Sequence, residues 1–252
     1  MDASPFYDEI ADLYHLIYAD WESSIRRQAD ALDGVLRAAL GQGPHHIVDV
    51  SCGIGTQALG LAALGHAVTA SDASARAIER ARREADERGL EIRFSVADMR
   101  RCDRHHEGPF DAVISADNSV PHLLTDAEIL EAFRCFHRLT RPGGVTLVTV
   151  RDYARESRET PQLRPYGVRT VPGGRYMIFQ VWDFVGPVYD VAMYFVRETA
   201  DARAEVRVAR ARYYAVDTDT LLSLLEMAGF SHAERIDGEY FQPVLLARRA
   251  GG

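Results

Sequence analysis

Residues 47–58 read IVDVSCGIGTQA, and this stretch decides the fold of the chain. Residues 47–50 form a short apolar run of the kind found in buried parallel strands. Gly53 and Gly55 follow, and glycine allows both the positive φ angles of a tight turn and the close approach of a ligand to the backbone. Helix-forming sequence then resumes, so the free N–H groups of a helix N-terminus face the turn. The stretch therefore predicts a strand, a glycine turn and a helix that together bind a nucleotide-like cofactor.

The turn by itself does not separate one class of nucleoside cofactor from another. The spacing of Gly53, Gly55 and Ala58 also satisfies the dinucleotide fingerprint, so an NAD-dependent oxidoreductase stays open at this point. Around the turn, helical patterns alternate with strand-like runs at residues 67–71, 92–96, 110–115 and 145–150. This alternation predicts an α/β fold with a Rossmann-like sheet, mostly parallel and doubly wound, covered by helices on both faces.

Composition narrows the range of partners. The formal charge is −8, and phosphate binding needs a basic face, so we expect a small-molecule substrate and no nucleic acid. All 29 basic residues are arginine, which excludes chemistry that needs a lysine, such as a Schiff base. The three cysteines show no metal-ligand spacing, and no apolar run reaches the length of a membrane span. We expect a reduced, cytoplasmic protein without a metal site or membrane contact, as a monomer or homo-oligomer.

Polar residues follow the ends of two predicted strands. Asp72 ends the second strand, where an acidic side chain accepts hydrogen bonds from both ribose hydroxyls in either cofactor class; the alternative is a helix-capping role. After the fourth strand, residues 116–123 contain Asp117, Asn118 and His122. Loops at the carboxyl ends of parallel strands hold ligands, so these side chains are candidates for a binding site.

The remaining segments predict a three-part organisation. Residues 1–44 form an N-terminal helical lid, in which residues 5–20 place Tyr7, Ile10, Tyr14 and Ile17 on one helix face; ordinary core packing is the alternative. Residues 45–151 and 215–252 form the cofactor-binding domain. Residues 152–214 read as antiparallel hairpins, with strands at 176–184, 188–196 and 204–214, and form an inserted β cap after the fifth strand.

The motif Asp49-x-Ser51-Cys52-Gly53-x-Gly55 resembles the first motif of class I S-adenosylmethionine-dependent methyltransferases. Over most of its length the chain is similar to the glycine N-methyltransferase group, which includes the bacterial glycine and sarcosine methylating enzymes. The stretches that carry this similarity are Tyr7, Arg27, residues 48–55, 69–74, 118–122, 141–144, 151–153 and 212–214. The chain departs from the group at Asp117, where a glycine is usual, and at residues 151–154, which read RDYA instead of RNYD.

The resemblance implies a role for each matching residue. The implied cofactor contacts are Tyr7, Tyr14, Arg27, Ser51, Gly53, Asp72, Ala73, Asp98, Met99, Ala116 and His122. Among them, Asp98 would bond the adenine amino group, and Arg27 would bind the methionine carboxylate. The implied substrate contacts are Asp117, Asn118, Arg151, Tyr194, Tyr213 and Tyr214, and the implied catalytic residues are Asn118, Arg151 and Tyr7. For Arg151 the alternative is a salt-bridged residue, paired with Asp152.

Together these features predict an S-adenosylmethionine-dependent methyltransferase that acts on a small molecule, through N-methylation of an amino acid or a related small amine. Several alternatives stay open. The same fold also supports O-methylation and other sulfonium chemistry, such as cyclisation or elimination. An NAD-dependent oxidoreductase and a non-catalytic cofactor-binding subunit are further alternatives.

Overall fold

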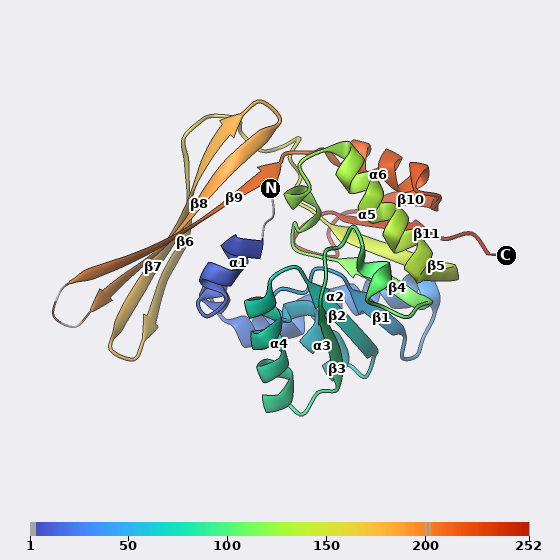
Figure 1. Cartoon of the computed structure of the whole chain (residues 1–252), viewed down its shortest axis with the longest axis horizontal. Helices are drawn as coiled ribbons and strands as arrows, with labels where there is room; N and C mark the ends of the chain where they lie inside the picture. The colour runs from blue at the N-terminus through green and yellow to red at the C-terminus, as the bar shows by residue number, and fades with distance from the viewer. Residues whose placement is uncertain (1–3, 200, 202, 252) are drawn as a thin grey trace.

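The computed structural model describes residues 4–199, 201 and 203–251, and it contains two separate β-sheets (Figure 1). The larger sheet has seven strands in the order β10-β11-β5-β4-β1-β2-β3. Its strands are β1 (His46–Asp49), β2 (Ala67–Asp72), β3 (Ile92–Val96), β4 (Phe110–Ser115), β5 (Thr140–Thr149), β10 (Ser231–Ile236) and β11 (Val244–Arg248). The first five pair in parallel, and β11 pairs antiparallel with β5 and β10. The predicted Rossmann-like, mostly parallel sheet is confirmed.

Helices cover both faces of this sheet, as the alternating pattern predicts. They are α2 (Trp21–Leu40), α3 (Thr56–Ala63), α4 (Ala75–Glu87), α5 (Asp126–Leu139) and α6 (Thr218–Met227). One core cluster packs α5 and α6 against the sheet, and another packs α2 and α3. Gly60 brings α2 and α3 into direct contact, because a Cβ there would lie 2.5 Å from Ala29 Cβ. This close packing fixes the helix that begins at the glycine turn.

The N-terminal segment is not the single aromatic helix that its spacing predicts. It forms α1 (Ser4–Ile10) and a 3-10 turn, η1 (Tyr14–Ile17), with a break between them. At the break the guanidinium of Arg80 in α4 donates to the carbonyls of Ala11 at 2.7 Å and Asp12 at 2.9 Å. These carbonyls therefore need no partner within a helix, and a contact from elsewhere in the chain ends α1.

The smaller sheet is the antiparallel insertion between β5 and α6. Its strands are β6 (Gln162–Val171), β7 (Gly174–Val185), β8 (Val188–Thr199) and β9 (Ala204–Tyr214), paired in that order. The sequence did not predict β6, because Pro165 and Gly167 look like strand breakers. Both residues flank a register shift on an edge strand, where proline is tolerated because its missing N–H faces no partner. In Figure 1 this sheet forms the left end of the molecule, with α1 on its right side.

Two short 3-10 turns, η2 (Cys102–Arg104) and η3 (Val120–His122), follow β3 and β4. They lie at the carboxyl edge of the parallel sheet, where its strand order changes direction between β1 and β4 and ligands usually bind. Within the described part of the chain, no helix combines the length and apolar character needed to cross a membrane.

Candidate functional site

Two neighbouring cavities open at this edge. The first, the turn pocket, has a volume of about 100 Å³ and lies over the glycine turn, bounded by the loops after β2, β3 and β4. The second, the chamber, has a volume of about 1140 Å³ and lies between the loops after β4 and β5, the 3-10 turn η1, the smaller sheet and residues 237–243. Tyr7, Tyr14, Tyr18 and Asp117 line both cavities, so they mark the boundary between them.

The glycine turn has the geometry that its sequence predicts. Gly53 and Gly55 have φ angles of 53° and 97°, and nothing lies within 4 Å of the place where a Cβ on Gly53 would sit. The backbone there is open to a ligand. Asp72 stands beside it, because its carboxylate accepts hydrogen bonds from the backbone N–H groups of Gly53 and Ser74, both at 2.8 Å. Burial raises the pKa of Asp72 above its ordinary value.

This arrangement suits a ribose. Asp72 is held rigidly by two backbone donors, and its oxygens retain lone pairs that can accept from hydroxyl groups over the turn. A ribose presents two such hydroxyls. Asp72 is therefore placed to bind the ribose of the expected cofactor beside the glycine turn.

Asp49 in β1 is a buried acid that the sequence reading did not assign to the site. Its Oδ1 accepts from the Ser51 N–H at 3.1 Å, and its Oδ2 has no hydrogen bond to any residue that the structure describes. Burial raises the pKa of the Asp49 carboxyl to about 7. Asp49 thus positions the start of the turn but does not line either cavity. The feature of the sequence that could have identified Asp49 was its position in the motif of residues 49–55.

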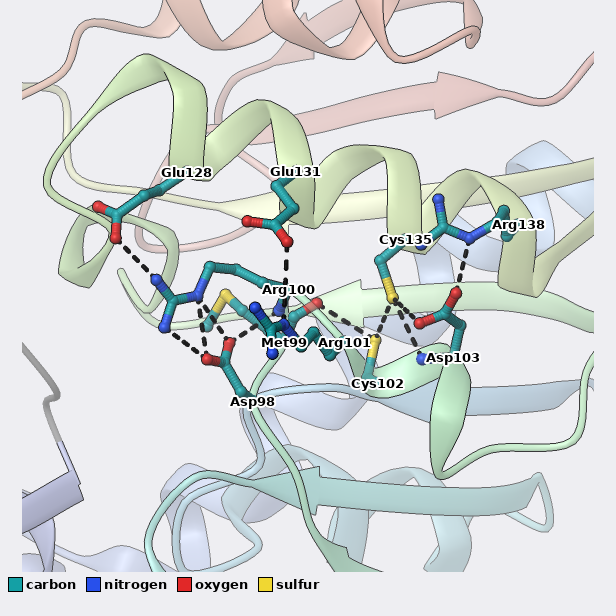
Figure 2. A network of polar contacts seen from close by, with 10 residues as sticks. All are labelled: Asp98, Met99, Arg100, Arg101, Cys102, Asp103, Glu128, Glu131, Cys135 and Arg138. Atoms are coloured by element: carbon teal, nitrogen blue, oxygen red, sulfur yellow. Dashed lines mark hydrogen bonds and ion pairs between the residues drawn. The ribbon is translucent and has the colours of Figure 1, made fainter.

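The loop after β3 departs from the expected arrangement. Asp98 and Met99 line the turn pocket, but the Asp98 carboxylate accepts from the backbone N–H of Arg100 at 2.9 Å and from its guanidinium at 3.0 Å (Figure 2). Burial opposes ionisation of Asp98, but these bonds outweigh it and hold its pKa below the ordinary value. Arg100 also donates to Glu128 of α5 at 2.7 Å. The carboxylate that was expected to face adenine is therefore bound to an arginine here.

The same loop joins α5 through two cysteines that are distant in the sequence. The sulfur atoms of Cys102 and Cys135 lie 3.0 Å apart and both residues are buried (Figure 2). Cys135 also accepts from the backbone N–H of Asp103. These contacts fix η2 against α5, and with it the residues that follow β3.

The loop after β4 places Asp117 at the boundary between the cavities. Asp117 and Asn118 adopt left-handed φ angles of 58° and 65°, which Asp and Asn tolerate better than most residues. Thr149 holds this conformation, because its hydroxyl accepts from Asp117 N–H at 2.8 Å and its carbonyl accepts from Asn118 N–H at 3.0 Å. The Asp117 carboxylate accepts from the Tyr18 hydroxyl at 3.1 Å and from the Gln242 amide at 3.3 Å. Burial raises the pKa of Asp117.

Tyr7, which lines both cavities, forms a pair with His122, which lines the turn pocket. The Tyr7 hydroxyl bonds His122 Nε2 at 2.8 Å, and the Tyr213 ring lies 4.0 Å from the imidazole, measured between ring centroids. Burial lowers the pKa of His122 to about 4, so the imidazole is neutral near pH 7. A neutral imidazole can accept a hydrogen bond from the Tyr7 hydroxyl, and this bond fixes the Tyr7 ring in α1 over the turn pocket.

Asn118 and Arg151 lie together in the chamber, but the Asn118 side chain is already engaged. Its Oδ1 accepts from the Arg151 backbone N–H at 3.0 Å and from the Tyr153 hydroxyl at 3.2 Å. The Arg151 guanidinium lies 4.7 Å over the Trp182 ring and contacts Glu156 at 3.4 Å. Its Nε is buried without a hydrogen-bond partner among the described residues. Asn118 therefore positions the Arg151 backbone, and the Arg151 guanidinium lines the chamber between Trp182 and Glu156.

The expected partner of Arg151, Asp152, bonds elsewhere. It contacts Arg155 at 3.3 Å and Arg235 at 2.7 Å. These pairs connect the end of β5 to the end of β10. Arg151 pairs with Glu156 instead of Asp152.

The structure brings most of the candidate residues together. The turn pocket is lined by Tyr7, Tyr14, Ser51, Gly53, Asp72, Ala73, Asp98, Met99, Ala116, Asp117 and His122. The chamber is lined by Tyr7, Tyr14, Arg27, Asp117, Asn118, Arg151 and Tyr213. Arg27, which the resemblance assigns to the methionine carboxylate, lines the chamber, and it donates to Ser24 of its own helix.

Tyr194 and Tyr214, which the resemblance assigns to the substrate site, line neither cavity. Side chains alternate between the two faces of a strand, and Tyr194 lies on the face of β8 opposite Tyr189 and Val191, which line the chamber. Tyr214 alternates with Tyr213 in the same way and packs against the core beside α5 and α6.

The sequence reading missed the chamber residues Tyr18, Glu156, Arg164, Trp182 and Tyr189. The period of two along residues 176–184 places Trp182 on one face with Gln180, but the sequence alone does not show which face is inside.

Comparisons with known proteins agree with the fold and with the expected class of enzyme. Residues 47–144 match the family model of the methyltransferase domain. The glycine/sarcosine N-methyltransferase of Parasynechococcus marenigrum (strain WH8102) is 29% identical over 136 residues, which cover 54% of this chain and 47% of that protein. The ubiquinone biosynthesis O-methyltransferase of Caulobacter vibrioides is 31% identical over 131 residues, which cover 52% of this chain and 50% of that protein. The chain therefore spans about half the length of the curated relatives it matches.

The similarity in fold extends further along the chain. The structure of S-adenosylmethionine-bound CalS10, an amino pentose methyltransferase from Micromonospora echinaspora, superimposes with a TM-score of 0.75. The two are 19% identical, and the match covers 89% of this chain and 92% of CalS10. At this identity the likeness shows a shared fold.

Proposed function

We propose that this chain, which carries a class I S-adenosylmethionine-dependent methyltransferase domain, methylates the nitrogen of a small amine that also bears an acidic group. The cofactor is S-adenosylmethionine, and when bound it supplies an electrophilic methyl group. The chain's own residues bind the cofactor, hold the acceptor in line with it and exclude water, which are the main requirements of a displacement reaction.

The residues of the turn pocket suit this cofactor. Asp72 can accept from ribose hydroxyls beside the open backbone of Gly53. Tyr7, fixed by His122, closes the pocket from the α1 side.

The position of Asp117 is the observation that favours nitrogen as the atom that accepts the methyl group. A buried carboxylate stands at the boundary of the two cavities, together with the rings of Tyr7, Tyr14 and Tyr18. A carboxylate and aromatic faces attract an ammonium group by charge and by cation–π contact. An amine bound there is oriented toward the turn pocket, and Asp117 can hold the proton that the amine must lose before it attacks.

Arg151 supports an acidic group on the same acceptor. Its guanidinium faces the chamber with a buried Nε that lacks a partner among the described residues, and a planar guanidinium can hold a carboxylate through two hydrogen bonds. The chamber, at about 1140 Å³, has room for an acceptor much larger than glycine. The resulting substrate is an amino acid or an acidic amine with a larger body.

A screen of amines, amino acids and their hydroxy analogues, with cofactor labelled in the methyl group and mass spectrometry of the products, tests the proposal. We expect N-methylated products and S-adenosylhomocysteine, at a rate that rises with pH toward the pKa of the amine. Methylthioadenosine as the product would contradict methyl transfer. Faster methylation of the hydroxy analogues would indicate that oxygen, and not nitrogen, accepts the methyl group.

Substitutions at two residues of the site, with one control, sharpen this test. Asp117→Asn should lower kcat/KM for the amine by about 10²-fold or more, because an amide offers no charge to an ammonium. Asp190→Asn is the matched control, since Asp190 pairs with Arg212 outside both cavities. Arg151→Lys should raise KM and, through misalignment, lower kcat. Unchanged kcat/KM in Arg151→Ala would contradict the acidic-group anchor.

A further inference from the structure

Gln242 contacts Asp117, although the two residues are 125 positions apart in the sequence. Gln242 comes shortly before β11, which begins at Val244, and Val244 pairs with Thr149 at the end of β5. The pairing of β11 with β5 therefore brings Gln242 beside Thr149, at the edge of the sheet where the chamber opens. Neither Gln242 nor Thr149 is among the residues that the sequence assigned to the site.

Asp117, Thr149 and Gln242 form a closed ring of hydrogen bonds. The Asp117 N–H donates to the Thr149 hydroxyl oxygen at 2.8 Å, and the Thr149 hydroxyl donates to Gln242 Oε1 at 2.9 Å. Gln242 Nε2 closes the ring by donating to Asp117 Oδ1 at 3.3 Å. Thr149 and Gln242 are both buried, so these polar groups satisfy one another.

The ring has one favoured direction. The Thr149 oxygen accepts from a backbone N–H, and its own proton goes to Gln242 Oε1. This bond turns the Gln242 NH₂ group toward Asp117. The opposite orientation of the amide would place its oxygen against an ionised carboxylate oxygen, and neither atom carries a proton. The ring therefore supplies a donor to the ionised form of Asp117.

We propose that Gln242 is a positioning residue for Asp117, and that its amide, oriented by the Thr149 hydroxyl, keeps the carboxylate ionised and turned toward the ammonium group of the acceptor. This role rests on the proposed function, in which Asp117 binds that ammonium group. Asp117 Oδ2 accepts from the Tyr18 hydroxyl at 3.1 Å, so a donor on each oxygen fixes the plane of the carboxylate. A hydrogen bond to the charged form of an acid also favours that form.

Asp117 differs from its ionisable neighbours in the pH range where it titrates. Among the described residues, the groups that act on it or feel its charge are Arg151, Tyr7, Tyr14, Tyr18, Tyr166 and Tyr240. Burial raises the pKa of each of these tyrosines above its ordinary value, and an arginine stays charged. Burial also raises the pKa of Asp117, and the bonds from Tyr18 and Gln242 and the charge of Arg151 oppose this rise.

Binding of tetramethylammonium in the presence of S-adenosylhomocysteine tests the role of Gln242. This cation does not titrate, so the pH dependence of its affinity reports on the protein. Broadening of its proton NMR signal measures the dissociation constant. In the wild type we expect the affinity to fall as the pH decreases from about 8 to about 4, with a midpoint where Asp117 becomes protonated. Asp117→Asn should abolish this pH dependence.

Gln242→Met removes the donor and nearly keeps the length of the side chain. We expect the midpoint to move up by about one pH unit, because the ionised carboxylate loses a hydrogen bond that the protonated acid does not need. Gln42→Met is the matched control, since Gln42 is exposed and lies outside both cavities, and it should keep the wild-type midpoint. Weaker binding at every pH with an unchanged midpoint would indicate a purely structural role and would overturn the inference.

Thr149 provides a second test if Gln242→Met fails to fold. Thr149→Val removes the hydroxyl that orients Gln242, so it should also move the midpoint up, and Thr149→Ser keeps the hydroxyl and should restore the wild-type midpoint. Circular dichroism and titration with S-adenosylhomocysteine check that each variant is folded. Equal midpoints in the valine and serine variants would overturn the inference.

The wild-type measurement separates this inference from the proposed function. A wild type that binds tetramethylammonium no better than Asp117→Asn at any pH would contradict the ammonium site, and the role of Gln242 with it. A wild type with a clear midpoint that the variants at Gln242 and Thr149 share would contradict the role of Gln242 alone.

Discussion

Asp72 connects the glycine turn to the cofactor. Its two oxygens accept from Gly53 N–H and Ser74 N–H, so a change to asparagine keeps the size of the side chain, removes its charge and leaves one of these two acceptors. Hydrogen bonds to a charged acceptor contribute about 1.5–3 kcal/mol each, so Asp72→Asn should weaken S-adenosylmethionine binding by about 10- to 100-fold. Isothermal titration measures this. Asp217→Asn, at a residue that caps α6 away from both cavities, should bind normally; an unchanged dissociation constant in Asp72→Asn would exclude the ribose role.

Asp49 makes stability depend on pH. Its folded-state pKa of about 7 lies above the value near 3.8 of an exposed aspartate, so between these values the folded state binds more protons than the unfolded state. The contribution of Asp49 to the free energy of unfolding should therefore be complete below pH 4 and should decrease as the pH rises to 7. One pKa unit corresponds to about 1.4 kcal/mol, so the fall attributable to Asp49 is a few kcal/mol.

Asp49→Asn should remove this fall, because asparagine does not titrate and its Oδ1 can still accept from Ser51 N–H. Urea unfolding at pH 4, 6 and 8 measures the slope for both proteins. Parallel profiles for the wild type and the variant would show that another group carries the pH dependence.

At the scale of elements, α1 closes the turn pocket through one carboxylate. Asp8 accepts from the Ser74 hydroxyl at 2.6 Å and from the Arg76 N–H at 3.1 Å, so it fastens α1 to the N-terminus of α4. Asp8→Ala should speed dissociation of bound S-adenosylhomocysteine several-fold, while unfolding free energy changes by about 1 kcal/mol or less, as for most partly exposed polar contacts.

Stopped-flow displacement of the cofactor product measures the dissociation rate. Asp30→Ala, an exposed acid on α2, provides the comparison and should leave the rate unchanged. An equal rate in Asp8→Ala would mean that α1 does not control access to the turn pocket.

At the scale of the whole molecule, the chamber exists because the smaller sheet stands apart from the parallel sheet. Its volume of about 1140 Å³ exceeds the usual range of about 300–1,000 Å³ for ligand pockets. A glycine bound there touches few of the walls, so it loses the contacts that align an acceptor. We expect kcat/KM for glycine and sarcosine to be at least about 100-fold below that of the best bulky amine found by screening. Competition assays with both substrates in one reaction measure this ratio, and equal values would restore glycine as the acceptor.

The sequence by itself determined the parallel sheet and the cofactor turn. Gly53 and Gly55 have φ angles that other residues rarely adopt, and short apolar runs that are bounded by turn residues favour buried strands, so these features depend on a few neighbouring residues. The position of Asp72 also depends on neighbouring residues, because Asp72 comes at the end of a strand next to the turn.

Only the tertiary structure decided which candidates meet. Tyr18 and Asp117 are 99 residues apart in the sequence and share a hydrogen bond, and Arg80 ends α1 from a distant helix. Tyr189 lies on the face of β8 that lines the chamber, and Tyr194 lies on the opposite face. The sequence could not show this, because a strand's period of two fixes which residues share a face but not which face is buried. Strand β6 exists because neighbouring β7 supplies the pairing that Pro165 and Gly167 would otherwise discourage. Each of these outcomes depends on contacts between distant segments, and such contacts form only when the whole chain has folded.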